Sequence, residues 1–323
     1  MDGTIENVKL VRAFIEFKAR EGKSRRTIQS YSLKLASFLE HIDPQPIDSL
    51  AVDALEGWLD RPRLKRCAAG RASLATIRNE SAILRSAFKF WSVRDLVPRN
   101  TAALLGNVDK PRRQPKPADQ KLVRLLLGQP LPLEERFVFE AMHHLGLRRE
   151  EVCRLRPSSF DTTNGLVTIE GKGAKERVIE YADLLAWQQA KGYAVGAFTQ
   201  TLSALLDARR DRLACDSYGR AQEAHMVPWG DHSRSAFAPM ADPQEVNKRL
   251  NRWLVAADTK AGSITPHQFR HAFGTWMLRH GMDVVLVSAL MGHSSLAVTQ
   301  GYLDLGSQPV RDLLRRELRE FNR

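Results

Sequence analysis

The segment ITPHQFRHAFGTWMLRHG, residues 264–281, holds the densest group of chemically active side chains in this 323-residue chain. Threonine is a good helix cap and proline is tolerated in the first turn, so the sequence predicts a helix that opens at Thr265 and Pro266. On that helix His267 and Arg270 are three residues apart and lie on the same side. The segment therefore places an imidazole and a guanidinium next to each other at the start of one helix.

A second histidine in this segment raises the question of a metal site. His267 and His271 have the four-residue spacing of a zinc-binding pair. The glutamate of the His-Glu-x-x-His metalloprotease motif is replaced by Gln268, and no third ligand stands nearby. No metal is expected, and His271 is interpreted as a core or supporting histidine.

The chain continues as DVVLVSALMGHSSLAVTQGYLD, residues 283–304. A helix is predicted to end at Gly292, because glycine adopts the left-handed conformation that closes helices. His293 then occupies the turn, and a serine after it can cap another short helix. Tyr302 lies near the end of that helix, where a lone tyrosine is usually structural.

Two segments farther upstream place more cations at defined positions. In GLRREEVCRL, residues 146–155, a helix is predicted to resume after a glycine turn, with Arg148 at its N-terminal end, where backbone donors favour an anion. In GLVTIEGKGAKERVIEY, residues 165–181, two β-branched runs flank a tight turn that contains Lys172, which predicts a hairpin. The turn lacks the spacing of a P-loop.

The remainder of the chain favours helices. Apolar residues recur at spacings of three and four between Val8 and Phe17 and between Ile28 and Leu39, with Ser24 as the expected N-cap of the second run. Further helices are predicted over 48–59, 73–91, 119–127 and 133–145.

A proline-rich linker divides the chain. Residues 109–117 contain three prolines and four basic residues, a composition typical of an extended connector. Up to Pro117 there are 22 Lys and Arg against 13 Asp and Glu, whereas the rest has 27 against 24. Most of the net charge of +12 therefore lies in the first third of the chain.

This concentration of positive charge predicts a polyanionic partner, and a DNA backbone fits best. The alternative is a solvated basic surface on a helical bundle. The expected DNA-contacting residues are Arg25, Arg26, Lys34, Arg78, Arg85, Lys89, Arg112 and Arg113.

Composition excludes several classes. Apolar residues make up 43% of the chain and charged residues 27%, so neither a disordered nor a fibrous protein is expected. No apolar run is long enough for a membrane span, and the N-terminus lacks the pattern of a secretory signal. Three widely separated cysteines argue against a disulfide framework. We expect a cytoplasmic protein, associated with the nucleoid.

One family combines these motifs in the same order. The chain resembles the tyrosine recombinases, or phage integrases, whose defining positions match Arg148, Lys172, His267, Arg270, His293 and Tyr302, with Glu151 at the supporting acidic position. The resemblance implies a mainly α-helical protein with a small antiparallel sheet. A helical core-binding domain would cover residues 1–108, followed by the 109–117 linker. An α+β catalytic domain would cover 118–323 and end in a tail helix.

The resemblance also implies a reaction, and the chemistry of the residues agrees with it. Two arginines can bind the non-bridging oxygens of a phosphodiester and stabilise the charge that develops on them. Tyr302 would be the nucleophile, giving a 3′-phosphotyrosyl bond that a 5′-hydroxyl reseals. His267 would accept the tyrosine proton, Lys172 would donate one to the leaving oxygen, and His293 would contact the phosphate. No cofactor is expected.

The expected partners are double-stranded DNA and further copies of the chain, as a dimer on each site and a tetramer on paired sites, with accessory recombination proteins possible. Integration, excision and resolution of a mobile element or replicon share this chemistry. Two alternatives stay open at this point: DNA relaxation as in type IB topoisomerases, and a DNA-binding accessory protein without catalysis.

Two features depart from compact members of the family. The 182–263 segment is long, and we interpret it as an elaborated helix and loop on the catalytic domain. The tail, residues 310–321, is amphipathic, and either it packs on its own domain or it docks on a neighbouring protomer.

Overall fold

The computed structural model describes residues 2–62, 72–108, 116–171, 176–193, 195, 197–209, 213–215, 221–223, 225–227, 229 and 242–292. The chain divides into two compact units, Met1–Arg112 and Arg113–Arg323, and the predicted linker spans the boundary between them. No helix among the described residues is long and apolar enough to cross a membrane.

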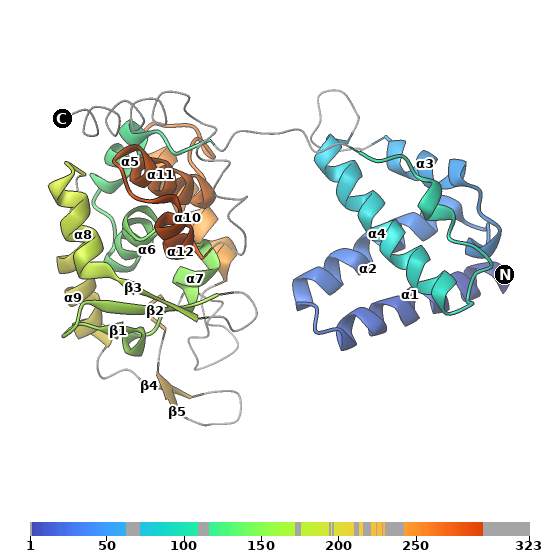
Figure 1. Ribbon diagram of the computed structural model, residues 1–323, viewed down its shortest axis with the longest axis horizontal. Coiled ribbons are helices and arrows are strands. Elements are labelled where there is room, and N and C mark those ends of the chain that lie inside the picture. Colours follow the sequence, from blue (N-terminus) through green and yellow to red (C-terminus); the bar gives the residue numbers. More distant parts are fainter. Residues whose placement is uncertain are drawn as a thin grey trace, which may run out of the picture. The chain divides into compact units, whose positions relative to one another are not determined.

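The first unit is a bundle of helices (Figure 1). Its elements are α1 (Asp2–Arg20), α2 (Arg25–Ile42), α3 (Val52–Asp60) and α4 (Leu74–Val93), with 3-10 turns η1 (Ile47–Ser49) and η2 (Thr101–Leu104). The predicted cap is present, because the Ser24 side chain accepts a hydrogen bond from the backbone N–H of Thr27. Trp58 and Trp91 are completely buried in a core of aromatic rings.

The helix predicted over 48–59 begins later than expected. Ile47–Ser49 forms a 3-10 turn, Leu50 and Ala51 are extended, and α3 starts at Val52. Ile47 and Leu50 are both buried, and the chain is extended at Leu50 and Ala51 before α3 begins.

The second unit is mainly helical around a small antiparallel sheet, which confirms the expected fold class. Its helices are α5 (Gln120–Leu127), α6 (Leu133–His144), α7 (Arg149–Arg154), α8 (Tyr181–Ala190), α9 (Phe198–Arg209), α10 (Pro243–Ala256), α11 (Pro266–Arg279) and α12 (Val284–Met291), with the 3-10 turn η3 (Pro157–Ser159). Helix α6 is buried along most of its length and packs against α9 and α11 (Figure 1).

The predicted hairpin forms the centre of the sheet. Strands β1 (Phe160–Asp161), β2 (Leu166–Glu170) and β3 (Glu176–Glu180) are antiparallel in that order, and Glu170 pairs with Glu176 at the turn end of the hairpin. The second strand stops at Glu180, because Tyr181 begins α8. A separate pair, β4 (Leu213–Cys215) and β5 (Ala221–Glu223), is also antiparallel.

Helix α10 is an element that the pattern analysis missed. It begins with Asp242 as N-cap and Pro243 in the first turn, and it buries Val246, Leu250 and Leu254 at a spacing of four. These are ordinary helix signals. The helix was therefore predictable from the sequence.

Candidate active site

Arg148 is positioned by a glycine turn and a short helix. Gly146 has φ 62°, a left-handed conformation, and a Cβ at this position would lie 2.4 Å from the Phe273 ring of α11. Glycine is required here both for the turn and for the close approach of α11. Arg148 follows as the N-cap of α7, which is the helix-end position that the sequence predicts.

Helix α11 supplies the histidine and the second arginine. Thr265 is its N-cap, and the Gln268 side chain accepts a hydrogen bond from the Thr265 backbone N–H at 2.8 Å. Arg270 is only 1% exposed. Its guanidinium donates to the carbonyl of Gly146 at 2.7 Å and to the carbonyl of Met291.

Glu151 is the central anion of the site. Its buried carboxylate accepts from the Arg148 backbone N–H at 2.8 Å and from the Arg148 Nη1 at 2.6 Å. Arg177 on β3 binds both carboxylate oxygens, at 3.0 and 2.8 Å. Burial raises the pKa of Glu151, but the hydrogen bonds and charge of Arg177, followed by the contacts of Arg148, lower it to about 2. Glu151 is therefore ionised at neutral pH.

Three arginines converge on the C-terminal end of α12. The carbonyl of Leu290 accepts from Arg177 Nε at 2.9 Å, and that of Gly292 accepts from Arg148 Nη2 at 2.9 Å. The Met291 carbonyl between them accepts from Arg270. Gly292 closes the helix with φ 58°, as predicted. Cations are favoured at this end, where the last carbonyls have no partner within the helix.

The two histidines of α11 form a close pair. The ring centroids of His267 and His271 are 4.1 Å apart, and His267 is exposed whereas His271 is half-buried. Burial, followed by the charges of Arg270 and Arg148, lowers the pKa of His267. Burial, followed by the charges of His267 and Arg270, lowers that of His271 to about 4. Both imidazoles are thus neutral at neutral pH, and a neutral ring can accept a proton.

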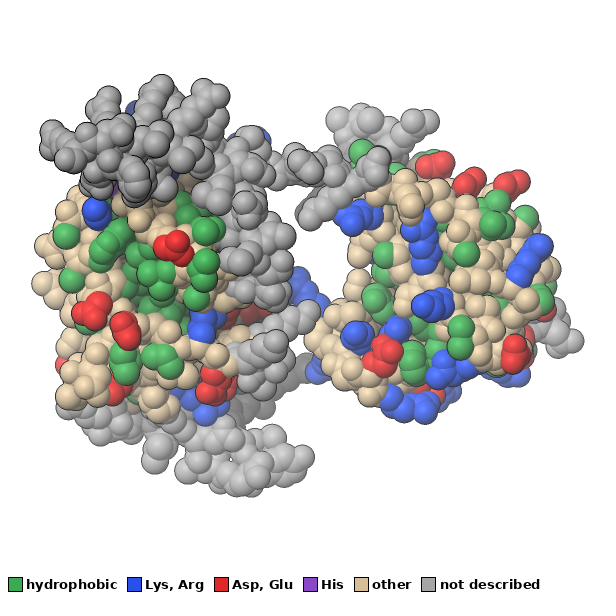
Figure 2. Space-filling model, viewed as in Figure 1, with side chains coloured by type: hydrophobic (Ala, Val, Ile, Leu, Met, Phe, Trp, Pro, Cys, Tyr) green, Lys and Arg blue, Asp and Glu red, His purple; other side chains and the backbone are tan. Residues whose placement is uncertain are grey.

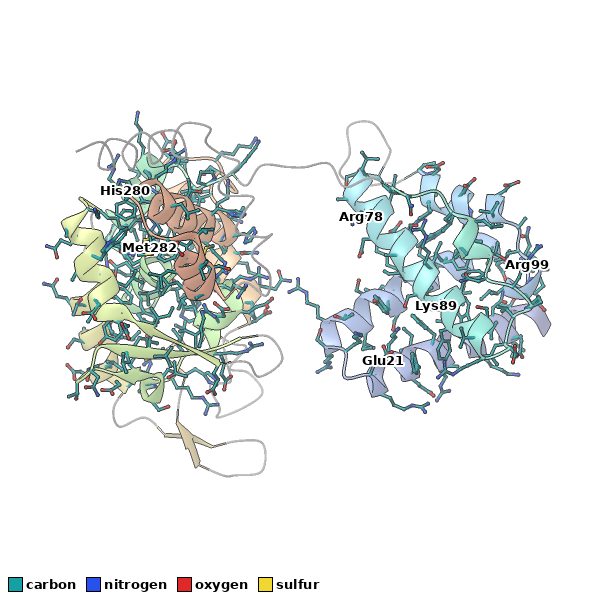
Figure 3. The ribbon with its side chains drawn as sticks, in the orientation of Figure 1. Glu21, Arg78, Lys89, Arg99, His280 and Met282 are labelled. Atoms are coloured by element: carbon teal, nitrogen blue, oxygen red, sulfur yellow. The ribbon has the colours of Figure 1, made fainter. Side chains whose placement is uncertain are left out.

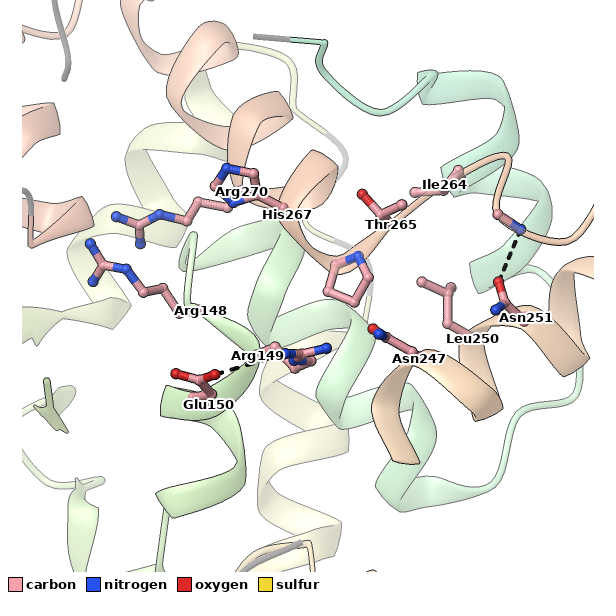
Figure 4. A pocket seen from close by; sticks show the side chains of 12 residues that line it. Arg148, Arg149, Glu150, Asn247, Leu250, Asn251, Ile264, Thr265, His267 and Arg270 are labelled. Atoms are coloured by element: carbon pink, nitrogen blue, oxygen red, sulfur yellow. Dashed lines mark hydrogen bonds and ion pairs between the residues drawn. The ribbon is translucent and has the colours of Figure 1, made fainter. Parts of the chain in front are cut away.

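A cavity of about 420 Å³ opens beside these groups. Arg148, His267 and Arg270 line one part of it, and Asn247 and Asn251 of α10 line another. Figure 4 shows the Arg148 and Arg270 side chains extending in the same direction from different elements. Two arginines and a neutral histidine thus line one cavity, and these residue types suit an anion that undergoes proton transfer.

The predicted site residues fall into two groups. Arg148, Glu151, His267 and Arg270 are described and lie together. Lys172, His293 and Tyr302 lie outside the described residues, as do Arg112 and Arg113. Within the described part of the chain no group of three or more potential metal ligands occurs.

The basic residues of the first unit differ in their surroundings. Arg25, Arg26, Arg78 and Lys89 are exposed, and Figure 3 shows the last two along α4. Lys34 is half-buried and pairs with the buried Glu80 at 2.8 Å, and Arg61 binds the same carboxylate. Arg85 donates to the carbonyls of Leu105 and Gly106.

Arg177 is the residue of the site that sequence reasoning missed. The sequence predicts only a hairpin strand at this position, because nothing local distinguishes Arg177 from other charged strand residues. Its partners, Glu151 and Leu290, are 26 and 113 residues away in the chain. Only the folded structure brings them together.

Comparison with known proteins gives a consistent result. Residues 118–308 match the model of the phage integrase family. The chain is 26% identical to tyrosine recombinase XerD of Haemophilus influenzae over 317 residues, covering 96% of this chain and 97% of that protein. It is 30% identical to tyrosine recombinase XerC of Mycobacterium bovis over 313 residues, covering 92% and 94%.

Two solved structures have a similar fold. One is lambda integrase, residues 75–356, as a dimer bound to a COC′ core site, with a TM-score of 0.67, 16% identity and coverage of 93% of this chain and 96% of that one. The other is the XerH recombinase bound to a palindromic difH substrate in a post-cleavage complex, with a TM-score of 0.61, 17% identity and coverage of 89% and 79%.

Proposed function

Because this chain belongs to the phage integrase family and is a tyrosine recombinase that cuts and rejoins DNA, we propose that the groups around Arg148 and Arg270 hold the DNA phosphate during the reaction. The observation that carries this proposal is that Arg148, His267 and Arg270, from two different elements, line one cavity.

The two arginines act as a phosphate clamp. Each is fixed by a backbone carbonyl, Gly292 for Arg148 and Gly146 for Arg270. Guanidiniums held in this way need no rearrangement when negative charge builds up on the phosphate oxygens. The clamp therefore stabilises the transition state rather than only the bound DNA.

His267 is the base for the nucleophile. Its lowered pKa keeps the ring neutral at neutral pH, so that it can take the proton of the attacking tyrosine hydroxyl. By residue type and position in the family pattern, Tyr302 is that nucleophile. Its oxygen bonds to phosphorus as the bond to the 5′-oxygen breaks.

Lys172 and His293 complete the set. Lys172 donates a proton to the departing 5′-oxygen, and His293 contacts the same phosphate. The phosphotyrosyl bond conserves the energy of the broken linkage. Rejoining by another 5′-hydroxyl therefore needs neither a nucleotide nor a metal cofactor.

The first unit supplies the nonspecific grip on the duplex. Lys and Arg side chains, blue in Figure 2, are spread over the face of this unit that is in view. Arg25, Arg26, Arg78 and Lys89 are exposed, and neutralising phosphates with such cations releases counterions. Lys34 and Arg85 contribute alongside their contacts within the unit, together with Arg112 and Arg113 of the linker.

The assembly proposed for this chain follows its relatives. Lambda integrase has been solved as a dimer bound to a COC′ core site and as a tetramer bound to a Holliday junction. We infer that this chain forms a dimer on each site and a tetramer on the paired sites. We also propose that the protein works in the cytoplasm, associated with the nucleoid.

Covalent capture tests the proposed chemistry. The purified chain is incubated with a duplex library of random sequence that carries a nick, and the adducts that survive denaturant are isolated and sequenced. We expect wild-type protein to yield adducts at a defined sequence and Tyr302→Phe to yield none. Adducts that persist in Tyr302→Phe would assign the nucleophile elsewhere.

The clamp is tested on the captured sequence. Arg148→Ala and Arg270→Ala should abolish adduct formation while the dissociation constant for the duplex changes little, because most of the grip lies in the first unit. DNA binding that is lost in parallel with cleavage would refute the assignment of the clamp.

A further inference from the structure

We propose that Arg177 is a positioning residue of the strand-cleavage reaction, which keeps Arg148 directed at the DNA phosphate by neutralising Glu151 from the opposite side. This inference rests on the proposed function of Arg148. Arg177 itself does not touch the phosphate in this scheme, so it acts only through Glu151 and through the end of α12.

Arg177 contacts the Glu151 carboxylate more completely than Arg148 does. Arg177 places a two-pronged guanidinium on both carboxylate oxygens, at 3.0 and 2.8 Å, whereas the Arg148 guanidinium reaches only Oε1. The Arg177 side chain is 14% exposed and that of Arg148 is 40% exposed. The inner arginine therefore makes the paired contact, and the outer arginine remains accessible from the cavity.

Arg177 also balances the negative charge of Glu151. Glu151 is 3% exposed, so its negative charge has little water to solvate it. With Arg177 present, the two guanidiniums and the carboxylate sum to one positive charge, which is available to a phosphate. Without Arg177, the carboxylate and Arg148 would neutralise each other. Glu151 would then hold Arg148 in a two-pronged pair that competes with the phosphate.

Arg177 also holds the C-terminal end of α12, which supports Arg148. Arg177 Nε donates to the carbonyl of Leu290 at 2.9 Å, two residues before the Gly292 carbonyl that holds Arg148. A Cβ on Gly292 would lie 2.9 Å from Arg177 Nη1, so the guanidinium packs directly on this turn. Arg177 thereby joins β3, α7 and α12, and it fixes two of the supports of Arg148 at once.

Single-turnover cleavage of a captured, nicked site tests the proposal. At saturating DNA we expect Arg177→Ala to form the covalent adduct about 10–100-fold more slowly, by analogy with the loss of a hydrogen-bond partner that orients a metal-ligating side chain. Its dissociation constant for DNA should match that of the wild type. Arg177→Lys restores the charge but not the fork, so its rate should lie between the two.

A double variant separates positioning from a merely structural role. In Arg177→Ala the unbalanced carboxylate is the cause of the defect, so adding Glu151→Gln should raise the rate roughly tenfold, within the range of coupling for residues in contact. Arg209→Ala is the control. Arg209 is also a buried arginine, 4% exposed, which pairs with Glu134 at 2.7 Å and has no place in the site.

The outcomes are distinct. Slow cleavage with unchanged DNA binding, intermediate in Arg177→Lys and partly recovered in the double variant, supports the proposal. An unchanged rate in Arg177→Ala would overturn it, as would a loss that equals that of Arg209→Ala and is not recovered in the double variant. Failure of wild-type protein to form any adduct would instead refute the proposed function.

Discussion

Gly146 lets Phe273 of α11 lie close to the turn that leads to Arg148. Replacing it with alanine forces a left-handed backbone on a residue with a Cβ, at about 1–2 kcal/mol. It also drives that Cβ into the Phe273 ring, and overpacking adds about 1–3 kcal/mol. We expect Gly146→Ala to lower the free energy of unfolding of the second unit by the sum of the backbone penalty and the overpacking penalty. Urea titration measures this loss.

Gly281→Ala is the matched control for this experiment. Gly281 also has a positive φ, 90°, but nothing lies within 4 Å of its virtual Cβ. It should show only the backbone penalty. Equal losses in the two variants would mean that the Phe273 contact contributes nothing.

The sequence identifies residues whose role can be recognised from the chain itself. Arg148, His267 and Arg270 occupy positions near helix starts, and those starts are visible from Gly146 and Pro266. Arg177 could not be found in this way, because its partners belong to elements that are distant in sequence. A contact of this kind depends on tertiary packing, which local pattern does not encode.

At the scale of the element, Glu135 fixes α10 to α6. Its carboxylate, 1% exposed, accepts from Arg249 at 2.6 Å, from Arg252 at 2.7 Å and from the Trp253 indole. Removing the carboxylate leaves the Trp253 indole and the half-buried Arg249 without their acceptor, whereas Arg252 is 60% exposed and can be solvated by water. We expect Glu135→Ala to reduce the free energy of unfolding of the second unit by about 1–3 kcal/mol, measured by calorimetry.

Glu245→Ala is the control for the Glu135 experiment. Glu245 also belongs to an ion pair of α10, with Lys248 at 2.6 Å, but the lysine side chain is 71% exposed. Solvent-exposed pairs contribute about 0–1 kcal/mol. A comparable loss in both variants would show that Glu135 has no special role in holding α10.

Element boundaries were predictable where a local signal ends the helix. Ser24 and Gly292 mark helix ends that the structure confirms. The break before Val52 and the end of β3 at Glu180 were not predicted, because neither Ala51 before α3 nor Glu180 before α8 provides a side-chain cap that would mark the boundary.

At the scale of the whole molecule, buried imidazoles make the second unit sensitive to acid. Burial lowers the pKa of His144 from 6.5 to about 4, because the charged ring would lose its hydration. The unfolded chain therefore takes up this proton first as the pH falls below 6.5, and stability is lost down to about pH 4. Between pH 6.5 and pH 4, His144 alone accounts for a loss of roughly 3 kcal/mol in the free energy of unfolding.

We expect His144→Leu to show a smaller loss of unfolding free energy than the wild type between pH 6.5 and pH 4. Urea titrations at several pH values, followed by tryptophan fluorescence, measure this slope. His41→Asn is the control, since His41 is exposed and lies in the first unit. If the free energy of unfolding of His144→Leu falls with pH as steeply as that of the wild type, His144 is not the source of the acid sensitivity.

The uneven charge of the chain predicts how DNA binding responds to salt. With about 6–10 phosphates neutralised, affinity for a duplex should fall by roughly 10³–10⁵ between 50 and 200 mM salt. Fluorescence anisotropy of a labelled duplex measures this. Arg78→Ala and Lys89→Ala should each reduce the salt slope by about one. Lys9→Ala is the control, because Lys9 pairs with Glu6, and it should leave the salt slope unchanged. If the affinity of the wild-type protein does not change with salt, the basic surface does not bind DNA.

The three carbonyls at the end of α12 also constrain its length. Successive residues of a helix are about 100° apart around the axis and about 1.5 Å apart along it. The Leu290 and Met291 carbonyls therefore start from different positions around the axis, Gly292 follows in the left-handed conformation, and an arginine from a different element meets each of the three. Inserting or deleting one residue within α12 would rotate all three carbonyls away from their arginines together. The helix tolerates changes of side chain far better than a change in the number of its residues.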